Sequence, residues 1–451
     1  MKAYSYIIFF FLISLFDVFA FKKLRSKESI EEIRFLYKQY QDIHPNPFKL
    51  HSKKEIDKDL EKLILNWGTQ DSISLKNFIL ESKRLIASMS LGHSRVRWSH
   101  PEIIKEAKRN VFIPFTISKK DNKFYIKDVL NSYRFKGEEL KLINGEKVSK
   151  LFLDCKSLFG GLEHHKDQQA LDFFGIFLFL KEVEAPFNLV FKSKNSSSVN
   201  GVNVFKYQDL AYKKFHDLKP YQFEFLEGNV ALISFNYYKN EKLFNNFITQ
   251  SFKTIDSLGI QKLIIDISND RGGSTWPNYQ IIRHLSTSPY RELSSRYWKV
   301  STLMKKQMKI DKSWTDFFGQ GLIDKYLTAK TGELLARENI PAHKPKKPIY
   351  FFEGNTVFII GTNTYSSGAY MANYVKTNNV AKLVGQPTGS PTNDFGEVTS
   401  FKLPKTAVSF DVCITYDIGV DEQKLLIAPV FPDVYAENEN AIQKAIEILE
   451  K

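Results

Sequence analysis

The sequence predicts an α/β protein of several domains, with a helical N-terminal segment, a β-rich module and an α/β C-terminal half built around a mixed sheet. Its 451 residues are too many for one compact core and enough for two or three domains. Apolar residues recur at helical spacing near the N-terminus and in short strand-like runs further on. From about residue 220, strand, turn and helix patterns follow one another, which is typical of crossover units around a sheet.

The N-terminal segment, residues 21–100, carries the helical pattern. Ser29 with Glu32 three residues later is typical of a capping box at the start of a helix. The apolar residues that follow keep a helical spacing as far as His44-Pro45, where the proline ends the helix.

Residues 101–215 change to the pattern of short strands. Phe112–Ile117 and Phe124–Ile126 flank a polar turn, and residues 137–145 form a strand that closes on an Asn-Gly turn. The polar, low-complexity stretch Ser193–Asn200 is predicted to be a surface loop.

The C-terminal half, residues 216–451, alternates strands and helices. Val230–Phe235 and Leu263–Ile267 are predicted to be buried strands separated by a helix near 241–257. Asn355–Gly361 is a third apolar run, which leads through a turn of small residues into another helix. Residues 300–345 lie between two of these strands and are long enough for a lid, a question the sequence leaves open.

The charge is strongly positive but forms no binding stripe. The formal net charge is +14, yet the Lys and Arg residues are spread along the chain. The densest short cluster, His343–Lys347, lies in a proline-containing connector. We expect a solvated basic surface and no nucleic-acid partner, because no nucleic-acid-binding signature is present.

The chain has two cysteines, Cys155 and Cys413. In an exported protein they form one disulfide or stay two separate buried thiols, and the sequence leaves both alternatives open. Neither has the Cys/His spacing of a zinc site, and the phosphate-binding glycine motifs are absent. We expect no metal and no cofactor.

Residues 1–20 are predicted to be a signal peptide. Lys2 gives a positive start, Ile7–Leu15 is almost wholly apolar, and Ala20 is the small residue expected at a cleavage site. The apolar run is shorter than the roughly 20 residues of a membrane span. We expect an exported protein (periplasmic, cell-surface or secreted) with no stable membrane span after cleavage. The alternative is an uncleaved N-terminal anchor.

Ser366 follows the apolar run 355–361 at a predicted strand-to-helix turn. A hydroxyl there is exposed at the end of the sheet, and the next backbone N–H groups have no intrahelical acceptor. The N–H of Ser367 and the helix dipole are therefore placed to hold an oxyanion formed when Ser366 attacks a carbonyl. The alternative is that Ser366 or Ser367 simply caps the helix.

Two other motifs supply matching groups. His93, beside Gly92 and just beyond a helix end, is placed to act as a general base, or is an ordinary surface histidine. Gly272 and Gly273 follow a buried strand, where paired glycines let a backbone N–H approach a ligand closely. They either complete an oxyanion hole or form a plain tight turn.

Together these motifs resemble peptidase family S41, the tail-specific or C-terminal-processing serine peptidases. That family pairs a strand ending in D-x-R-x-N-x-G-G with a later T-x-S-x-x-E, then G-E-P-T and a P-D near the C-terminus. The spacing from Ser366 to Gly385 matches the family's spacing between its nucleophilic serine and its G-E-P-T motif. The resemblance therefore implies that Ser366, and not Ser367, is the nucleophile. The resemblance runs from about residue 27 to the end. The matching segments are Asp266 to Gly273, Thr364-Tyr365-Ser366, Gly385-Gln386-Pro387-Thr388 and Pro432-Asp433.

Departures from the family pattern favour its histidine-dependent branch over its Ser–Lys branch. The lysine that follows G-E-P-T in the Ser–Lys branch is absent at Gly389-Ser390-Pro391. Leu91-Gly92-His93-Ser94 resembles the D-G-H-[ST] of the other branch without its Asp. Ala369 stands at the family's Glu and Ser268 at its Arg. The third, orienting acid of that branch lies near the C-terminal P-D, where Asp421 and Glu422 are the nearest acids, and of the two we choose Glu422.

The sequence thus predicts an exported serine endopeptidase that hydrolyses polypeptides. The resemblance implies that Ser366 attacks the scissile carbonyl, that His93 takes its proton and that Glu422 orients His93. Residues 101–215 look like a degenerate PDZ-type peptide-binding module. The alternatives are a catalytically inactive relative that binds peptides, and hydrolysis of a non-peptide ester or amide. The oxyanion hole would consist of the N–H groups of Ser367 and Gly273 or Gly272.

Overall fold

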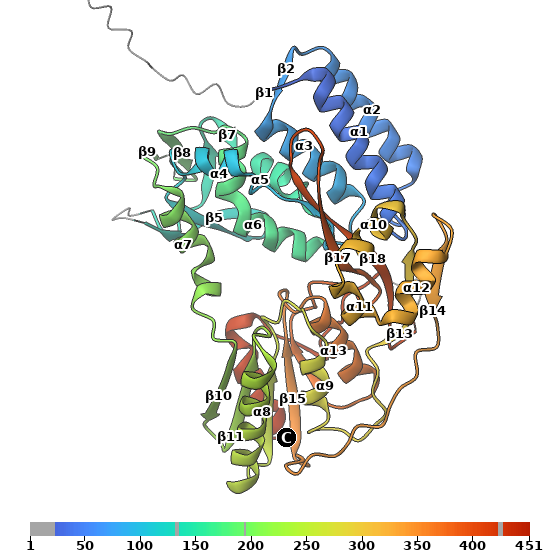
Figure 1. Cartoon of the computed structure of the whole chain (residues 1–451). Helices are drawn as coiled ribbons and strands as arrows, with labels where there is room; N and C mark the ends of the chain where they lie inside the picture. Colours follow the sequence, from blue (N-terminus) through green and yellow to red (C-terminus); the bar gives the residue numbers. More distant parts are fainter. Residues whose placement is uncertain (1–22, 131–134, 194, 423–426) are drawn as a thin grey trace, which may run out of the picture.

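A computed structural model describes residues 23–130, 135–193, 195–422 and 427–451 (Figure 1). The predicted signal peptide, residues 1–20, lies outside this part. The architecture is mixed α/β with several separate sheets, which confirms the predicted fold class. No helix in the described ranges is long and apolar enough to cross a membrane.

Three helices build the N-terminal part (the blue ribbons of Figure 1). The predicted cap at Ser29 is wrong, because the first helix begins at Ser26 and buries Ser29 inside it. The Glu32 carboxylate accepts hydrogen bonds from the backbone N–H groups of Lys405 and Thr406, at 3.0 and 3.1 Å. A buried carboxylate needs such partners, so Glu32 forms a tertiary contact and not a cap. The elements are β1 (Lys23–Arg25), α1 (Ser26–Ile43), α2 (Lys53–Gly68), β2 (Ser72–Ser74) and α3 (Leu75–Ser88).

The middle part contains two small sheets. In the four-stranded sheet the order is β7-β6-β8-β9. Asn144 and Gly145 form the predicted turn, with φ of 47° and 81°. The stretch Ser193–Asn200 is not simply a loop, because part of it pairs antiparallel with β8 as the edge strand β9. The strands are β4 (Phe115–Lys120), β5 (Lys123–Val129), β6 (Leu140–Ile143), β7 (Glu146–Lys147), β8 (Phe187–Phe191) and β9 (Ser196–Val199).

Four helices accompany these sheets. The longest, α6, carries a run of large apolar side chains and packs against α5, α7 and β4. Cys155 on α5 is a free, buried thiol, and so is Cys413, so the two cysteines do not pair. The helices are α4 (Pro101–Ala107), α5 (Val148–Lys156), α6 (Glu163–Leu180) and α7 (Val204–His216).

A six-stranded sheet with order β10-β11-β12-β15-β16-β19 forms the centre of the C-terminal half. All neighbours pair in parallel except β10 with β11. One face packs against residues of α8, α9 and α13, and the other against α14, so both faces are buried. The strands are β10 (Tyr221–Leu226), β11 (Val230–Phe235), β12 (Lys262–Asp266), β15 (Asn355–Ile360), β16 (Lys382–Gly385) and β19 (Val434–Tyr435), and the helices are α8 (Glu241–Ser257), α9 (Trp276–Ile282), α13 (Ser367–Thr377) and α14 (Ala441–Leu449).

A second sheet, with order β14-β13-β18-β17, connects the N-terminal helical part with the C-terminal half. Strand β3, which follows the predicted His93 motif, pairs with β18 through Val96 and Phe410. The N-terminal helical part is therefore attached directly to the C-terminal half (Figure 1). The strands are β3 (Arg95–Val96), β13 (Leu293–Lys299), β14 (Leu334–Arg337), β17 (Asp394–Lys402) and β18 (Ser409–Gly419).

Residues 300–345 form helices α10 (Thr302–Ile310), α11 (Ser313–Phe318) and α12 (Gln320–Thr328) together with β14. Met304, Ile323 and Tyr326 are buried in the largest hydrophobic cluster of the protein. None of the described side chains in this segment lines the cavity described below.

Candidate active site

One cavity, with a volume of about 780 Å³, is lined by side chains from all three parts of the chain. The segment between α3 and β3 contributes His93, helix α7 contributes Phe215, and the start of α13 contributes Ser366. The motifs that lie far apart in sequence therefore meet around one space. The predicted site residues that line it are His93, Gly272, Gly273, Ser366 and Ser367.

Ser366 occupies a strained turn between β15 and α13. Its backbone has φ 54° and ψ −121°. A residue with a side chain rarely adopts such a conformation, which costs about 1–3 kcal/mol. The side chain makes no capping hydrogen bond, although Ser366 stands at the N-cap position of α13. Helix capping therefore does not account for this serine.

Neighbouring loops hold the strained turn in place. The N–H of Ser366 donates to the hydroxyl of Ser390 at 2.8 Å. The N–H of Tyr365 donates to the carbonyl of Asp270, also at 2.8 Å. These two hydrogen bonds join the turn to the loops that follow β16 and β12. They hold the backbone in place, so the strained conformation persists.

Gly272, in the loop that follows β12, packs closely against Ser366. A Cβ added at Gly272 would lie 2.5 Å from the Ser366 Cβ and 3.1 Å from the Ser367 nitrogen, so no side chain fits there. Gly272 is not available as an oxyanion donor, because its N–H already donates to the Asp270 carboxylate at 3.0 Å. No hydrogen bond within the described residues uses the N–H of Gly273 or Ser367. These two N–H groups remain the candidates for an oxyanion hole.

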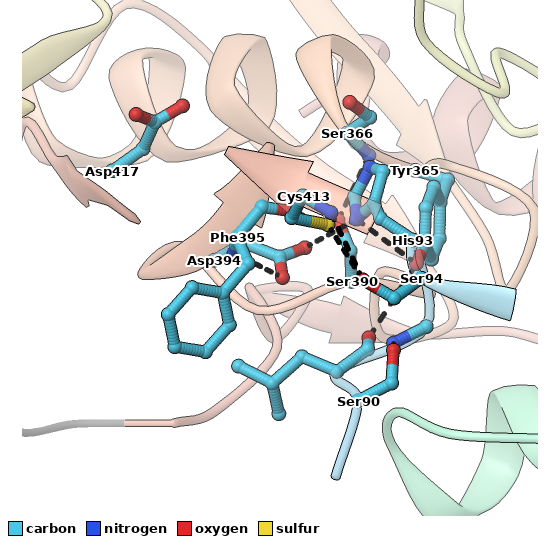
Figure 2. Close-up of polar contacts among 12 residues, drawn as sticks. Ser90, His93, Ser94, Tyr365, Ser366, Ser390, Asp394, Phe395, Cys413 and Asp417 are labelled. Atoms are coloured by element: carbon cyan, nitrogen blue, oxygen red, sulfur yellow. Dashed lines mark hydrogen bonds and ion pairs between the residues drawn. The ribbon is translucent and has the colours of Figure 1, made fainter. Parts of the chain in front are cut away.

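His93 pairs with a buried carboxylate that the sequence did not single out. Its Nδ1 lies 3.3 Å from Asp394 Oδ2, and Asp394 is fully buried at the start of β17 (Figure 2). The N–H of Phe395 donates to the other oxygen of this carboxylate, Oδ1, at 2.7 Å. Burial raises the pKa of Asp394, while the neighbouring His93 acts in the opposite direction. The buried Nε2 of His93 has no hydrogen-bond partner in the described structure, so it is available to a reactant.

Tyr365, the residue before Ser366, lies between two imidazole rings. Its ring centroid is 4.7 Å from that of His93 and 4.7 Å from that of His165, which stacks on it at 24°. Its hydroxyl oxygen is 3.3 Å from His93 Nδ1. His165 bonds to the Thr362 carbonyl at 3.0 Å, and burial lowers the pKa of His165 to about 4. Helix α6 therefore contributes directly to the wall of the site, which the sequence did not suggest.

Glu422 does not occupy the position that the resemblance implied. It is more than half exposed and pairs with Arg291, whereas the carboxylate beside His93 belongs to Asp394. The sequence contains only a weak signal for Asp394. It is an acidic residue at the start of a strand, and no recognisable motif adjoins it. Its contact with His93 depends on how β17, β18 and β3 pair.

Two further carboxyl groups lie behind the glycine loop, of which Asp270 is fully buried and Glu292 is partly buried. Burial raises the pKa of Asp270 to about 7 and that of Glu292 to about 7, and repulsion from Glu292 adds to the effect at Asp270. The side-chain amide of Asn278 donates to Glu292 at 2.6 Å and to the Ser367 carbonyl at 2.8 Å. This network supports the first turn of α13.

Attack by a serine requires a base within reach and donors for the developing oxyanion. The cavity offers His93 as the base, and the N–H groups of Gly273 and Ser367 as the donors. Within the described ranges no cluster of three or more His, Cys, Asp or Glu side chains is arranged to hold a metal ion. The base and the two donors are the groups that a serine hydrolase requires.

Residues 228–408 match the sequence profile of the family described as Peptidase family S41. This range includes the glycine loop, Ser366 and Asp394, but not His93. This part of the chain is therefore similar to the S41 peptidases, in agreement with the motifs. No curated protein sequence matches the chain.

Solved structures agree with the fold. A crystal structure of a CPAF serine-to-alanine mutant has a TM-score of 0.64 at 14% identity, covering 94% of this chain and 96% of that one. Mature CPAF complexed with lactacystin has a TM-score of 0.61 at 14% identity, covering 94% and 97%. At such low identity the likeness concerns the fold alone.

Proposed function

We propose that the protein is an exported serine endopeptidase that hydrolyses polypeptides through an acyl-enzyme on Ser366, with His93 as the base. The observation that carries this proposal is the strained turn of Ser366, which opens on the same cavity as the paired His93 and Asp394. The match to peptidase family S41 supports peptide bonds as the substrate.

In the proposed reaction His93 Nε2 accepts the proton of the Ser366 hydroxyl while Oγ bonds to the scissile carbonyl carbon. The N–H groups of Ser367 and Gly273 donate to the oxyanion that forms. The proton then passes from Nε2 to the leaving nitrogen, the C–N bond breaks, and an ester on Ser366 remains. Water, deprotonated by His93, hydrolyses the ester by the same two steps.

Asp394 replaces Glu422 as the orienting acid in this proposal. A carboxylate beside Nδ1 favours the tautomer that carries its proton on Nδ1, which leaves the Nε2 lone pair for Ser366. It also stabilises the imidazolium formed during the reaction. No hydrogen bond joins Ser366 to His93 among the described residues, and such bonds are often loose without substrate.

Labelling by a fluorophosphonate tests the nucleophile and the base together. We expect covalent labelling at Ser366, detected by peptide mass mapping, and its loss in both Ser366→Ala and His93→Ala. Unfolded β-casein should be cleaved by the wild type and not by Ser366→Ala. Equal cleavage by the two proteins would refute the assignment.

Export is a separate part of the proposal and rests on the pattern of residues 1–20. N-terminal sequencing of the protein recovered from a secreting host should find cleavage after Ala20. A full-length N-terminus in the membrane fraction would instead support the uncleaved anchor.

A second candidate is an inactive relative that binds peptides in the same cavity. Two observations favour it: Ala369 replaces the family's Glu, and Ser366 has no hydrogen bond to His93. Peptide binding without fluorophosphonate labelling at any pH would select this candidate over the enzyme.

A further inference from the structure

The charged groups of the cavity wall are almost all neutralised by one another. Arg95 and Arg97 lie 3.1 and 2.9 Å from the Asp411 carboxylate. Arg296 lies 2.7 Å from Asp417 and 3.0 Å from Glu397. The remaining arginine of the wall, Arg271, forms no ion pair and no side-chain hydrogen bond within the described part of the chain.

Arg271 lies next to the reacting groups. It immediately precedes Gly272, whose Cα packs against the Ser366 side chain. Its guanidinium carbon is 3.4 Å from the centroid of the Phe215 ring on α7. A guanidinium that stacks through its face keeps its N–H donors at the edge, so Phe215 orients the group and leaves the donors unused.

The surroundings of Arg271 do not supply the missing anion. Asp172 on α6 lines the same cavity and attracts Arg271, but beyond ion-pair distance. The Asp172 carboxylate accepts a hydrogen bond from Gln168 at 2.9 Å. Arg271 is exposed, so its donors are open to a ligand, and a guanidinium oriented by an aromatic ring favours a planar anion such as a carboxylate.

We infer that Arg271 binds the carboxylate of an Asp or Glu side chain of the substrate close to the scissile bond. The inference rests on the proposed function, because a polypeptide cut within its length offers side-chain carboxylates near that bond. A terminal carboxylate has the same chemistry, and the experiment below separates the two sources.

Binding to protein carrying Ser366→Ala tests the inference without catalysis. The probes are fluorescein-labelled Ala-Ser decapeptides with one central Glu or Gln, each with an amidated or a free C-terminus. Fluorescence anisotropy gives their Kd values. We expect the Glu peptide to bind about 10- to 100-fold more tightly than the Gln peptide, with either C-terminus.

Adding Arg271→Gln should abolish this ratio, while Arg271→Lys should retain part of it because the charge remains. Arg95→Gln is the matched control, since it removes one positive charge from the same wall and leaves Arg97 on Asp411. It should preserve the ratio. Thermal unfolding of each variant checks the fold.

Equal binding of the Glu and Gln peptides overturns the inference, as does a Glu preference that survives Arg271→Gln. A preference that follows only the free C-terminus overturns it in favour of a terminal carboxylate. Failure of the proposed function is a different result, namely no fluorophosphonate labelling of Ser366, and it does not affect the binding ratio.

Discussion

The hydroxyl oxygen of Tyr365 and Nδ1 of His93 lie 3.3 Å apart, the same distance that separates Nδ1 from Asp394 Oδ2. The phenol also donates to the Leu91 carbonyl at 3.5 Å, so toward Nδ1 it is either a donor or an acceptor. When the phenol donates to Nδ1, the ring proton is on Nε2 and the imidazole cannot accept a proton there. When Asp394 accepts from Nδ1, Nε2 is free to act as a base.

We therefore expect Tyr365→Phe to strengthen the pairing of His93 with Asp394. Asp394 is then the sole described partner of Nδ1, which favours the tautomer with its proton on Nδ1 and leaves Nε2 free to accept the Ser366 proton. We expect kcat/KM for peptide hydrolysis to rise by about two- to tenfold, the effect of losing one competing hydrogen bond. The measurement is kcat/KM of both proteins at one pH, and an unchanged or lower value would argue against this role of Tyr365.

Asp394→Asn should reduce kcat/KM by roughly 100- to 10,000-fold, because an amide beside Nδ1 favours the wrong tautomer. Glu422→Gln is the control, since Glu422 pairs with Arg291 on a more exposed surface. It should leave kcat/KM within about twofold of the wild type. The opposite ranking of the two variants would restore Glu422 as the orienting acid.

Gly272→Ala should abolish fluorophosphonate labelling of Ser366. The new methyl group would lie 2.5 Å from the Ser366 Cβ and would push the nucleophile out of place. Gly259→Ala places a methyl group on another glycine with positive φ, where no atom lies within 4 Å. Labelling of this control should match the wild type. Normal labelling of Gly272→Ala would mean that the loop does not support the turn.

Ser366→Gly should be more stable than Ser366→Ala by about 1 kcal/mol. Glycine adopts a φ of 54° without steric cost, whereas alanine keeps the strain of the native serine. Both variants lack the hydroxyl, so the comparison isolates the backbone. The measurement is chemical denaturation monitored by circular dichroism, and a less stable glycine variant would show that the turn is not strained.

The buried Asp270 and the partly buried Glu292 should make the protein less stable as the pH rises from about 4 to 7. Their pKa values are about 7 in the folded protein and near 4 in an unfolded chain, so the folded state binds more protons in this window. Their contribution is complete below pH 4 and is lost as the pH passes 7. Glu292→Gln should flatten the pH dependence of the free energy of unfolding, and the half-exposed Glu61→Gln should not.

Local patterns predicted the strand-to-helix turn that carries Ser366, and the structure has a turn at that position. A buried strand followed by small residues and a helix defines a strand-to-helix turn, and β15, Ser366 and α13 form it. The glycine pair after β12 is also recognisable from the local sequence, because only glycine tolerates the close approach of Ser366 at Gly272. The same local method failed at Ser29, where a cap-like pattern lies inside α1.

What the sequence by itself determined is where the main strands and helices lie along the chain, since this follows from apolar spacing and turn chemistry over a few residues. Only the tertiary structure decided which acid stands beside His93. Asp394 reaches it because β3 and β17 both pair with β18, and strand pairing between distant segments leaves no local signature. The tertiary structure likewise decided that Tyr365 and His165 join the site and that Arg271 stacks on Phe215 without a carboxylate partner in the described chain.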